Sequence, residues 1–87
     1  MKEDERRLAI ATLEALDARG AGVWNSVSVW IVSNGLGQPI HERRLLWIVK
    51  KWERKGYWEP LMTLSGNFTP AGRDWVMPLF ELLEGVA

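Results

Sequence analysis

The start of the chain carries apolar side chains at helical spacing. Leu8 and Leu16 lie on one stripe of the helical wheel, which Leu13 widens, and acidic residues at the start favour the positive end of a helix dipole. Gly20 is a natural stop, because glycine reaches the left-handed conformation without steric cost. The pattern therefore predicts a helix over residues 2–19.

A second segment, residues 41–55, is strongly amphipathic. Its apolar side chains share an arc of about 100° on the helical wheel: Leu45, Ile48, Val49 and Trp52. Cations gather on the opposite side around Trp47, whereas Glu42 and Glu53 share the remaining flank. We expect a helix that ends at Gly56. Its exposed surface should carry cations on one side and acidic residues on the other.

Residues 23–34 fit two structures. Valine and isoleucine alternate there with serine and tryptophan, as in a half-buried strand. In the helical interpretation, Asn25 or Ser26 is the N-cap and Gly35 ends the helix. Local propensity favours the strand. The long helix that follows favours the helix, because a hairpin strand would need a partner strand there. We predict a helix and keep the strand as the alternative.

Residues 57–69 are predicted to form a β-hairpin. Side chains that favour strands flank the Ser-Gly-Asn sequence at 65–67, which is typical of a turn. Pro60 has no N–H to donate to a neighbouring strand. The hairpin should therefore lie at the edge of any sheet.

The end of the chain is predicted to be helical. Thr69 suits the N-cap position and Pro70 the first position of that helix. Pro78 should kink or restart it, and the tail beyond is apolar: Leu79, Phe80, Leu82 and Leu83. Together the segments predict a single domain over residues 1–87, mainly α with a small β-hairpin, in the order α-α-α-β-β-α.

Composition excludes several kinds of chemistry. The chain has no cysteine, which excludes disulfides, thiolate metal sites and cysteine nucleophiles. Its one histidine, His41, cannot form a metal site or a catalytic triad alone. No phosphate-binding loop or nucleophile–base pair is visible. We therefore expect neither an enzyme nor a bound metal or cofactor.

The sequence also lacks the signals of export and of membrane insertion. Its start is too charged for a signal peptide. No apolar run approaches the roughly 20 residues that a helix needs to cross a bilayer. We expect a cytoplasmic protein that does not bind membranes.

Charge is balanced overall but unevenly distributed. The formal net charge is zero, and the isoelectric point is about 6.6. Residues 39–58 hold six basic and two acidic side chains, whereas residues 21–38 hold none of either kind. Such asymmetry can create a local positive surface on a neutral protein.

Two motifs resemble those of a known fold. Residues 44–58 resemble the end of a winged-helix recognition helix that runs into the first wing strand. The Phe-Thr-Pro-Ala-Gly-Arg sequence at 68–73 resembles the Thr-Pro-x-Gly-Arg segment that closes the wing in MarR and PadR regulators. The likeness covers residues 41–76 well and the earlier part in outline. The opening, residues 1–10, bears a fainter resemblance to small winged-helix proteins of Mu-like phages.

The resemblance implies a winged helix-turn-helix fold and a DNA-binding transcriptional regulator of bacterial or phage origin. In this fold the second helix braces the third, which lies in the major groove, and the hairpin reaches the flanking backbone. The residues that would contact DNA are Gln38, His41, Arg43, Arg44, Trp47, Lys50, Lys51 and Arg54. An arginine can form two hydrogen bonds to guanine, and lysine suits phosphate.

Several of these residues also have a structural interpretation. His41 suits the N-cap of the helix over 41–55. Lys50, Lys51 and Arg54 lie near the helix C-terminus, where cations complement the dipole and keep the surface soluble. Among the tryptophans, we expect three in the core, whereas Trp47 lies on the outward arc: the expected core members are Trp30, Trp52 and Trp75.

Self-association is predicted from the apolar surface. The helix over 2–19 and the tail over 78–84 together carry more apolar side chains than a small core easily covers. We therefore expect a two-fold homodimer through these segments, which would also reinforce weak DNA binding. The alternative function is a protein–protein interaction module, with Trp47, Trp58 and the apolar tail as its docking surface.

Overall fold

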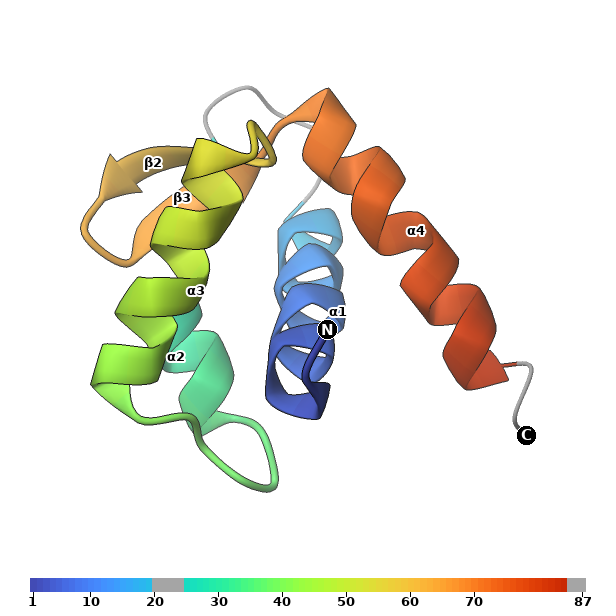
Figure 1. The fold of residues 1–87 in the computed structure, drawn as a ribbon, viewed down its shortest axis with the longest axis horizontal. Helices are drawn as coiled ribbons and strands as arrows, with labels where there is room; N and C mark the ends of the chain where they lie inside the picture. Colours follow the sequence, from blue (N-terminus) through green and yellow to red (C-terminus); the bar gives the residue numbers. More distant parts are fainter. Residues whose placement is uncertain (20–24, 85–87) are drawn as a thin grey trace.

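The computed structural model describes residues 1–19 and 25–84, with side chains up to Phe80. Within these residues the chain forms four helices and three short strands (Figure 1). In chain order they are α1 (Glu3–Ala18), β1 (Val27–Ser28), α2 (Val29–Asn34), α3 (Glu42–Arg54), β2 (Trp58–Met62), β3 (Ser65–Phe68) and α4 (Pro70–Glu84). The predicted mainly helical fold with a small β-hairpin is confirmed, and one further strand, β1, completes the sheet.

The sheet is antiparallel, with β3 in the middle and β2 at one edge. The predicted hairpin over 57–69 and the edge position of Pro60 are therefore confirmed. The prediction of a turn at 65–67 is wrong, because these residues belong to β3 and the turn lies before them. Position 66 of β3 requires a glycine, because a Cβ there would lie 2.8 Å from the Trp58 ring.

The segment over 23–34 contains a strand and then a helix, and its first two residues lie outside the described part. Val27 and Ser28 pair with β3, and the Val29 N–H donates to the Leu64 carbonyl at 2.8 Å. The N-cap is Ser28, not Asn25 or Ser26, and its Oγ accepts from the Ile31 N–H at 3.4 Å. Residues 27–28 thus follow the strand propensity of the segment, whereas residues 29–34 form the helix that the topology favoured. Gly35 caps this helix, as predicted.

The core lies between α1, α3 and the sheet, with Trp52 at its centre. Its ring centroid is 5.3 Å from that of Phe68, 5.8 Å from that of Trp58 and 5.9 Å from that of Trp75. Trp52 is buried and Trp75 is half-buried against it, as predicted. Trp30 is 51% exposed, so its predicted place in the core is wrong. It follows Val29 in α2 and so points about 100° away from the side of the helix that Val29 and Ser33 bury.

Helix α1 buries its apolar side chains inside the chain itself: Leu8, Ile10, Leu13 and Leu16 are all in the core. In Figure 1, α1 lies between α3 and α4, and α4 leans against it on the side away from the hairpin. The chain therefore covers the apolar side of α1 by itself; of the predicted apolar tail, Leu79 is buried and Phe80 half-buried, whereas the side chains of Leu82 and Leu83 lie outside the described part. Gly20, the predicted stop, lies outside the described residues.

The ends of α3 follow from its sequence. His41 is the N-cap, and its Nδ1 accepts from the Arg43 N–H at 3.1 Å. Gly56 ends the helix with a φ of 76°, which an L side chain rarely adopts. Before α3, the buried Ser33 Oγ accepts from the Ile40 N–H at 2.7 Å and ties the connection to α2.

Thr69 joins the hairpin to α4. Its Oγ1 donates to the Gly56 carbonyl at 2.6 Å and accepts from the Gly72 N–H at 3.0 Å, so the predicted N-cap is confirmed. Helix α4 continues unbroken through Pro78 (Figure 1), and the predicted restart is wrong. The missing N–H leaves the carbonyl four residues earlier, that of Asp74, without a helical partner. Both residues are exposed, so water can reach that carbonyl.

Candidate nucleic-acid interface

The outward side of α3 presents four exposed side chains that were predicted to contact DNA: Arg43, Trp47, Lys50 and Arg54. We call these four residues the outer face. The apolar residues Leu45, Ile48, Val49 and Trp52 point the other way, into the core, because they follow helical periodicity. Trp47 is 50% exposed, as its place on the helical wheel predicted. No ion pair involves the cations of the outer face within the described residues.

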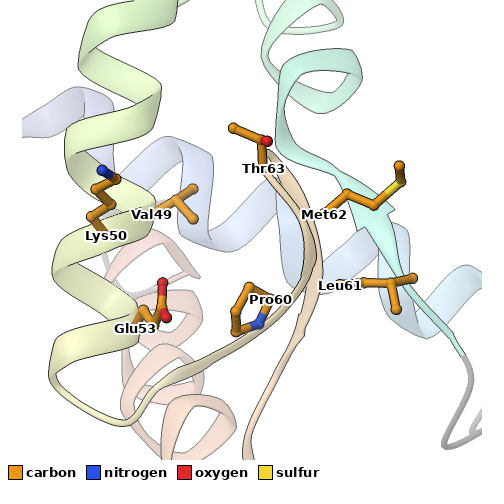
Figure 2. A pocket seen from close by; sticks show the side chains of 7 residues that line it. All are labelled: Val49, Lys50, Glu53, Pro60, Leu61, Met62 and Thr63. Carbon is orange, nitrogen blue, oxygen red and sulfur yellow. The ribbon is translucent and has the colours of Figure 1, made fainter.

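Two shallow hollows flank Lys50 and Glu53. The first, of about 480 Å³, lies on the outer face between these two residues, Trp47 and Arg54. The second, of about 380 Å³, is a groove between α3 and the hairpin. Its lining is Val49, Lys50, Glu53, Pro60, Leu61, Met62 and Thr63 (Figure 2). Lys50 and Glu53 therefore form a ridge between the two hollows.

The groove has very different walls. Figure 2 shows Val49, Lys50 and Glu53 projecting from α3 on one side and the hairpin on the other. The hairpin wall carries no cation, because its contributing residues run from Pro60 to Thr63. Any attraction of the groove for an anion must therefore come from Lys50, against the opposing charge of Glu53.

Arg44 does not belong to the outer face. It turns toward the start of α1, where its Nε lies 2.8 Å from Asp4 Oδ2 and its Nη2 lies 3.0 Å from Asp4 Oδ1. Two parallel hydrogen bonds make this a forked pair, the strongest geometry between these groups. The hydrogen bond from Arg44 holds the pKa of Asp4 below its ordinary value.

Lys51 is paired with α1 in a similar way. Its Nζ lies 3.0 Å from Glu5 Oε1, and the other oxygen of Glu5 accepts from Trp52 Nε1 at 3.1 Å. Glu5 is only 1% exposed. The buried carboxylate thus has a partner for each oxygen, as a charged group inside a protein requires.

Trp47 lies between the two paired cations along the helix. The Arg44 Cζ is 4.9 Å from the centroid of its ring, and the Lys51 Nζ is 5.4 Å away. Both distances are within the range of a cation–π interaction. The indole therefore marks the border between the side of α3 that faces α1 and the outer face.

Gln38 and His41 lie before α3, and both are exposed. His41 Nδ1 is used as the N-cap acceptor, as its structural interpretation predicted. The eight predicted contact residues thus fall into three places: the outer face, the connection before α3, and the side of α3 that faces α1. Sequence reasoning missed the partners of Arg44 and Lys51. The one sequence feature that pointed to these partners was the acidic start of α1, and the helix dipole alone was enough to explain it.

No protein-family model, curated protein or solved structure matches this chain. The described residues contain no group of three histidine, aspartate or glutamate side chains that could hold a metal ion. None of the described helices is both long and apolar enough to span a membrane. The resemblance to winged-helix regulators and the expectation of DNA binding stay predictions.

Proposed function

We propose that this chain is a winged helix-turn-helix domain that binds double-stranded DNA through the outer face of α3. The observation that carries the proposal is the outer face itself, which joins three exposed cations to a half-exposed indole on one side of a helix. The opposite side of α3 is core, so the outer face is presented rigidly. The order of helices and the sheet with β3 at its centre support the winged-helix assignment.

The dimensions of DNA fit this arrangement. A major groove about 12 Å wide admits an α-helix. Arg43, near the start of α3, would face base edges, and guanine offers it two acceptors. Lys50 and Arg54 would contact phosphate, which positions the helix without reading sequence. The hairpin adds no cation, so the expected contact is weaker than in winged helices with a basic wing.

The proposed role is regulation of transcription in a bacterium or phage, in the cytoplasm, without catalysis or a cofactor. A homodimer would present two copies of α3 to one duplex and strengthen a weak contact. The apolar side of α1 is used inside the chain, so of the two segments predicted for the dimer α4 is the one that remains, with Met77 exposed. Light scattering at micromolar concentrations would test it, and the mass of one chain would reject it.

A salt titration of DNA binding tests the main proposal. Binding to a duplex should weaken steeply as salt rises, because each neutralised phosphate releases counterions. Lys50→Ala should reduce the salt slope by about one, as the loss of one phosphate contact predicts. Arg73→Ala is the control, since it removes one positive charge from α4, where the exposed pair of Arg73 with Asp17 contributes little to stability. Equal binding by the two variants would move the contact away from the outer face.

A protein-docking module is the second candidate. Trp58, which was predicted for its docking surface, is buried in the core, so that part of the prediction is wrong. The large apolar side chains that are exposed lie on α2 and on the hairpin, namely Trp30, Ile31, Leu61 and Met62. Exposed apolar groups of this size are typical of contact surfaces between proteins. An apolar interface hardly responds to salt, so the same titration separates the two candidates.

A further inference from the structure

We propose that Arg44 is a reserve phosphate contact, which Asp4 occupies in the free protein and a DNA phosphate occupies in the complex. This proposal rests on the proposed function. It adds a residue to the contact surface that the free structure hides, and it assigns the acidic start of α1 a role in binding. Lys51, on the same side of α3, is assigned no such contact.

The chemistry of the exchange is direct. A carboxylate and a phosphate both present two oxygens to the fork of a guanidinium group. Asp4 offers its two oxygens at 2.8 and 3.0 Å, so it fills the position that a phosphate would take. Arg44 also packs on the ring of Trp47, at the border of the outer face. The site for phosphate therefore adjoins the surface proposed to meet DNA.

Exposure makes the Asp4 pair exchangeable. The side chain of Asp4 is 28% exposed and that of Arg44 is 25% exposed, so water can solvate either group during the exchange. Asp4 Oδ1 also accepts from the Glu5 N–H at 2.7 Å. After release of Arg44, the carboxylate keeps this hydrogen bond and reaches solvent, and no buried charge is left behind.

The neighbouring pair cannot exchange in this way. Glu5 is buried, and its second oxygen accepts from the buried Trp52 in the centre of the core. Withdrawal of Lys51 would leave a buried carboxylate without its cation, which is strongly unfavourable. Adjacent acidic residues of α1 thus have different roles: Asp4 can be displaced, and Glu5 braces the fold.

The test compares two variants of equal charge. Asp4→Asn frees Arg44, whereas Glu3→Gln makes the same change of charge one residue earlier, where the side chain pairs with Arg6. Gel-shift titrations on a random duplex pool, at one salt concentration, should give Asp4→Asn an affinity about fivefold above that of Glu3→Gln, the factor expected for a partly exposed ion pair. Thermal melts checked by circular dichroism confirm that both variants are folded.

A double-variant cycle identifies Arg44 as the cause. Arg44→Ala should remove the whole gain in the Asp4→Asn background. It should change the affinity of the wild type much less, because there Arg44 must leave Asp4 before it contacts phosphate, and the loss of the phosphate contact is offset by the Asp4 pair that no longer has to be broken. A gain that survives in the double variant would overturn the proposal.

The remaining outcomes separate this proposal from the function beneath it. If Asp4→Asn binds like Glu3→Gln or more weakly, while Lys50→Ala still reduces affinity, Arg44 is not a reserve contact and DNA binding stands. If folded wild type and Asp4→Asn both fail to bind duplex DNA, the reserve contact and the proposed function are overturned together.

Discussion

Helix α3 carries cations on two sides, and the two sides differ in what surrounds them. Arg44 and Lys51 are held by carboxylates of α1, and the second of these carboxylates is buried. Arg43, Lys50 and Arg54 are exposed on the outer face, with no ion-pair partner among the described residues. A count of positive charge along the sequence therefore overstates the surface that a polyanion meets, because part of that charge is committed to the fold.

The largest effect should come from removing Glu5, the buried carboxylate that pairs with the side of α3 facing α1. Glu5→Ala should lower the free energy of unfolding by about 3 kcal/mol, because Trp52 Nε1 loses its acceptor in the core and Lys51 loses its counter-charge. Urea denaturation measures the change. Glu14→Ala, an exposed position on the same helix, is the control and should change stability by less than about 0.5 kcal/mol. Similar stabilities for the two variants would mean that the buried pair does not brace α3.

The outer face should behave in the opposite way. Arg43→Ala/Arg54→Ala should weaken binding to duplex DNA about tenfold and reduce the salt slope by about one, because Arg54 is the phosphate contact of the two, while the urea midpoint stays unchanged. Both side chains are exposed, so their loss leaves no buried partner unsatisfied. A lower urea midpoint would show instead that these cations also stabilise the fold.

A positive charge added to the hairpin would sharpen the contrast between α3, which carries cations, and the hairpin beside it, which carries none. Met62 is 71% exposed at the groove beside α3, so Met62→Lys should raise DNA affinity about threefold by supplying one phosphate contact. Ala18→Lys adds the same charge at the exposed end of α1 and is the matched control. An equal gain in both variants would indicate a general effect of net charge and not a contact by the hairpin.

The smallest effect concerns the partly exposed ion pair between Arg44 and Asp4. The pKa of Asp4 is lowered below 3.8 by its hydrogen bond with Arg44, so the folded state favours the ionised carboxylate. Its contribution to stability is present above that ordinary value and is lost as the pH falls through the lowered pKa. Asp4→Asn should therefore cost less than about 1 kcal/mol at pH 7 and a smaller amount at pH 3. Urea unfolding at both pH values checks this, and a constant difference would contradict it.

The local features of the fold were predictable because they depend on neighbouring residues. The helices over 2–19 and 41–55 follow from apolar periodicity, and Thr69 with Pro70 marks the start of α4. Strand β1 was not resolved from the helix that follows it, because it exists only by pairing with β3. Gly66 was misassigned to a turn for the same reason, since the Trp58 ring that requires a glycine belongs to the neighbouring strand.

The candidate site was predictable on one side of α3 only. The helical wheel identified the outward direction of Trp47 and its neighbouring cations, because periodicity separates them from the core. The pairing of Arg44 with Asp4 joins residues 40 positions apart, and that of Lys51 with Glu5 joins residues 46 apart. Such contacts depend on how α1 and α3 pack, which no local pattern encodes.

Pro60 has a consequence for how the molecule behaves among copies of itself. Strand β2 is an open edge, and Leu61 and Met62 beside Pro60 are exposed and apolar, a combination that invites strands of other chains to add in register and grow into fibres. Just before β2, the Tyr57 carbonyl accepts from the N–H of Thr69, which follows β3, so by alternation along the antiparallel pair the backbone of Trp58 and Pro60 faces outward. At Pro60 the outward nitrogen carries no hydrogen. An incoming strand therefore meets a gap in the ladder, and the proline protects the domain against polymerisation without altering the surface of α3.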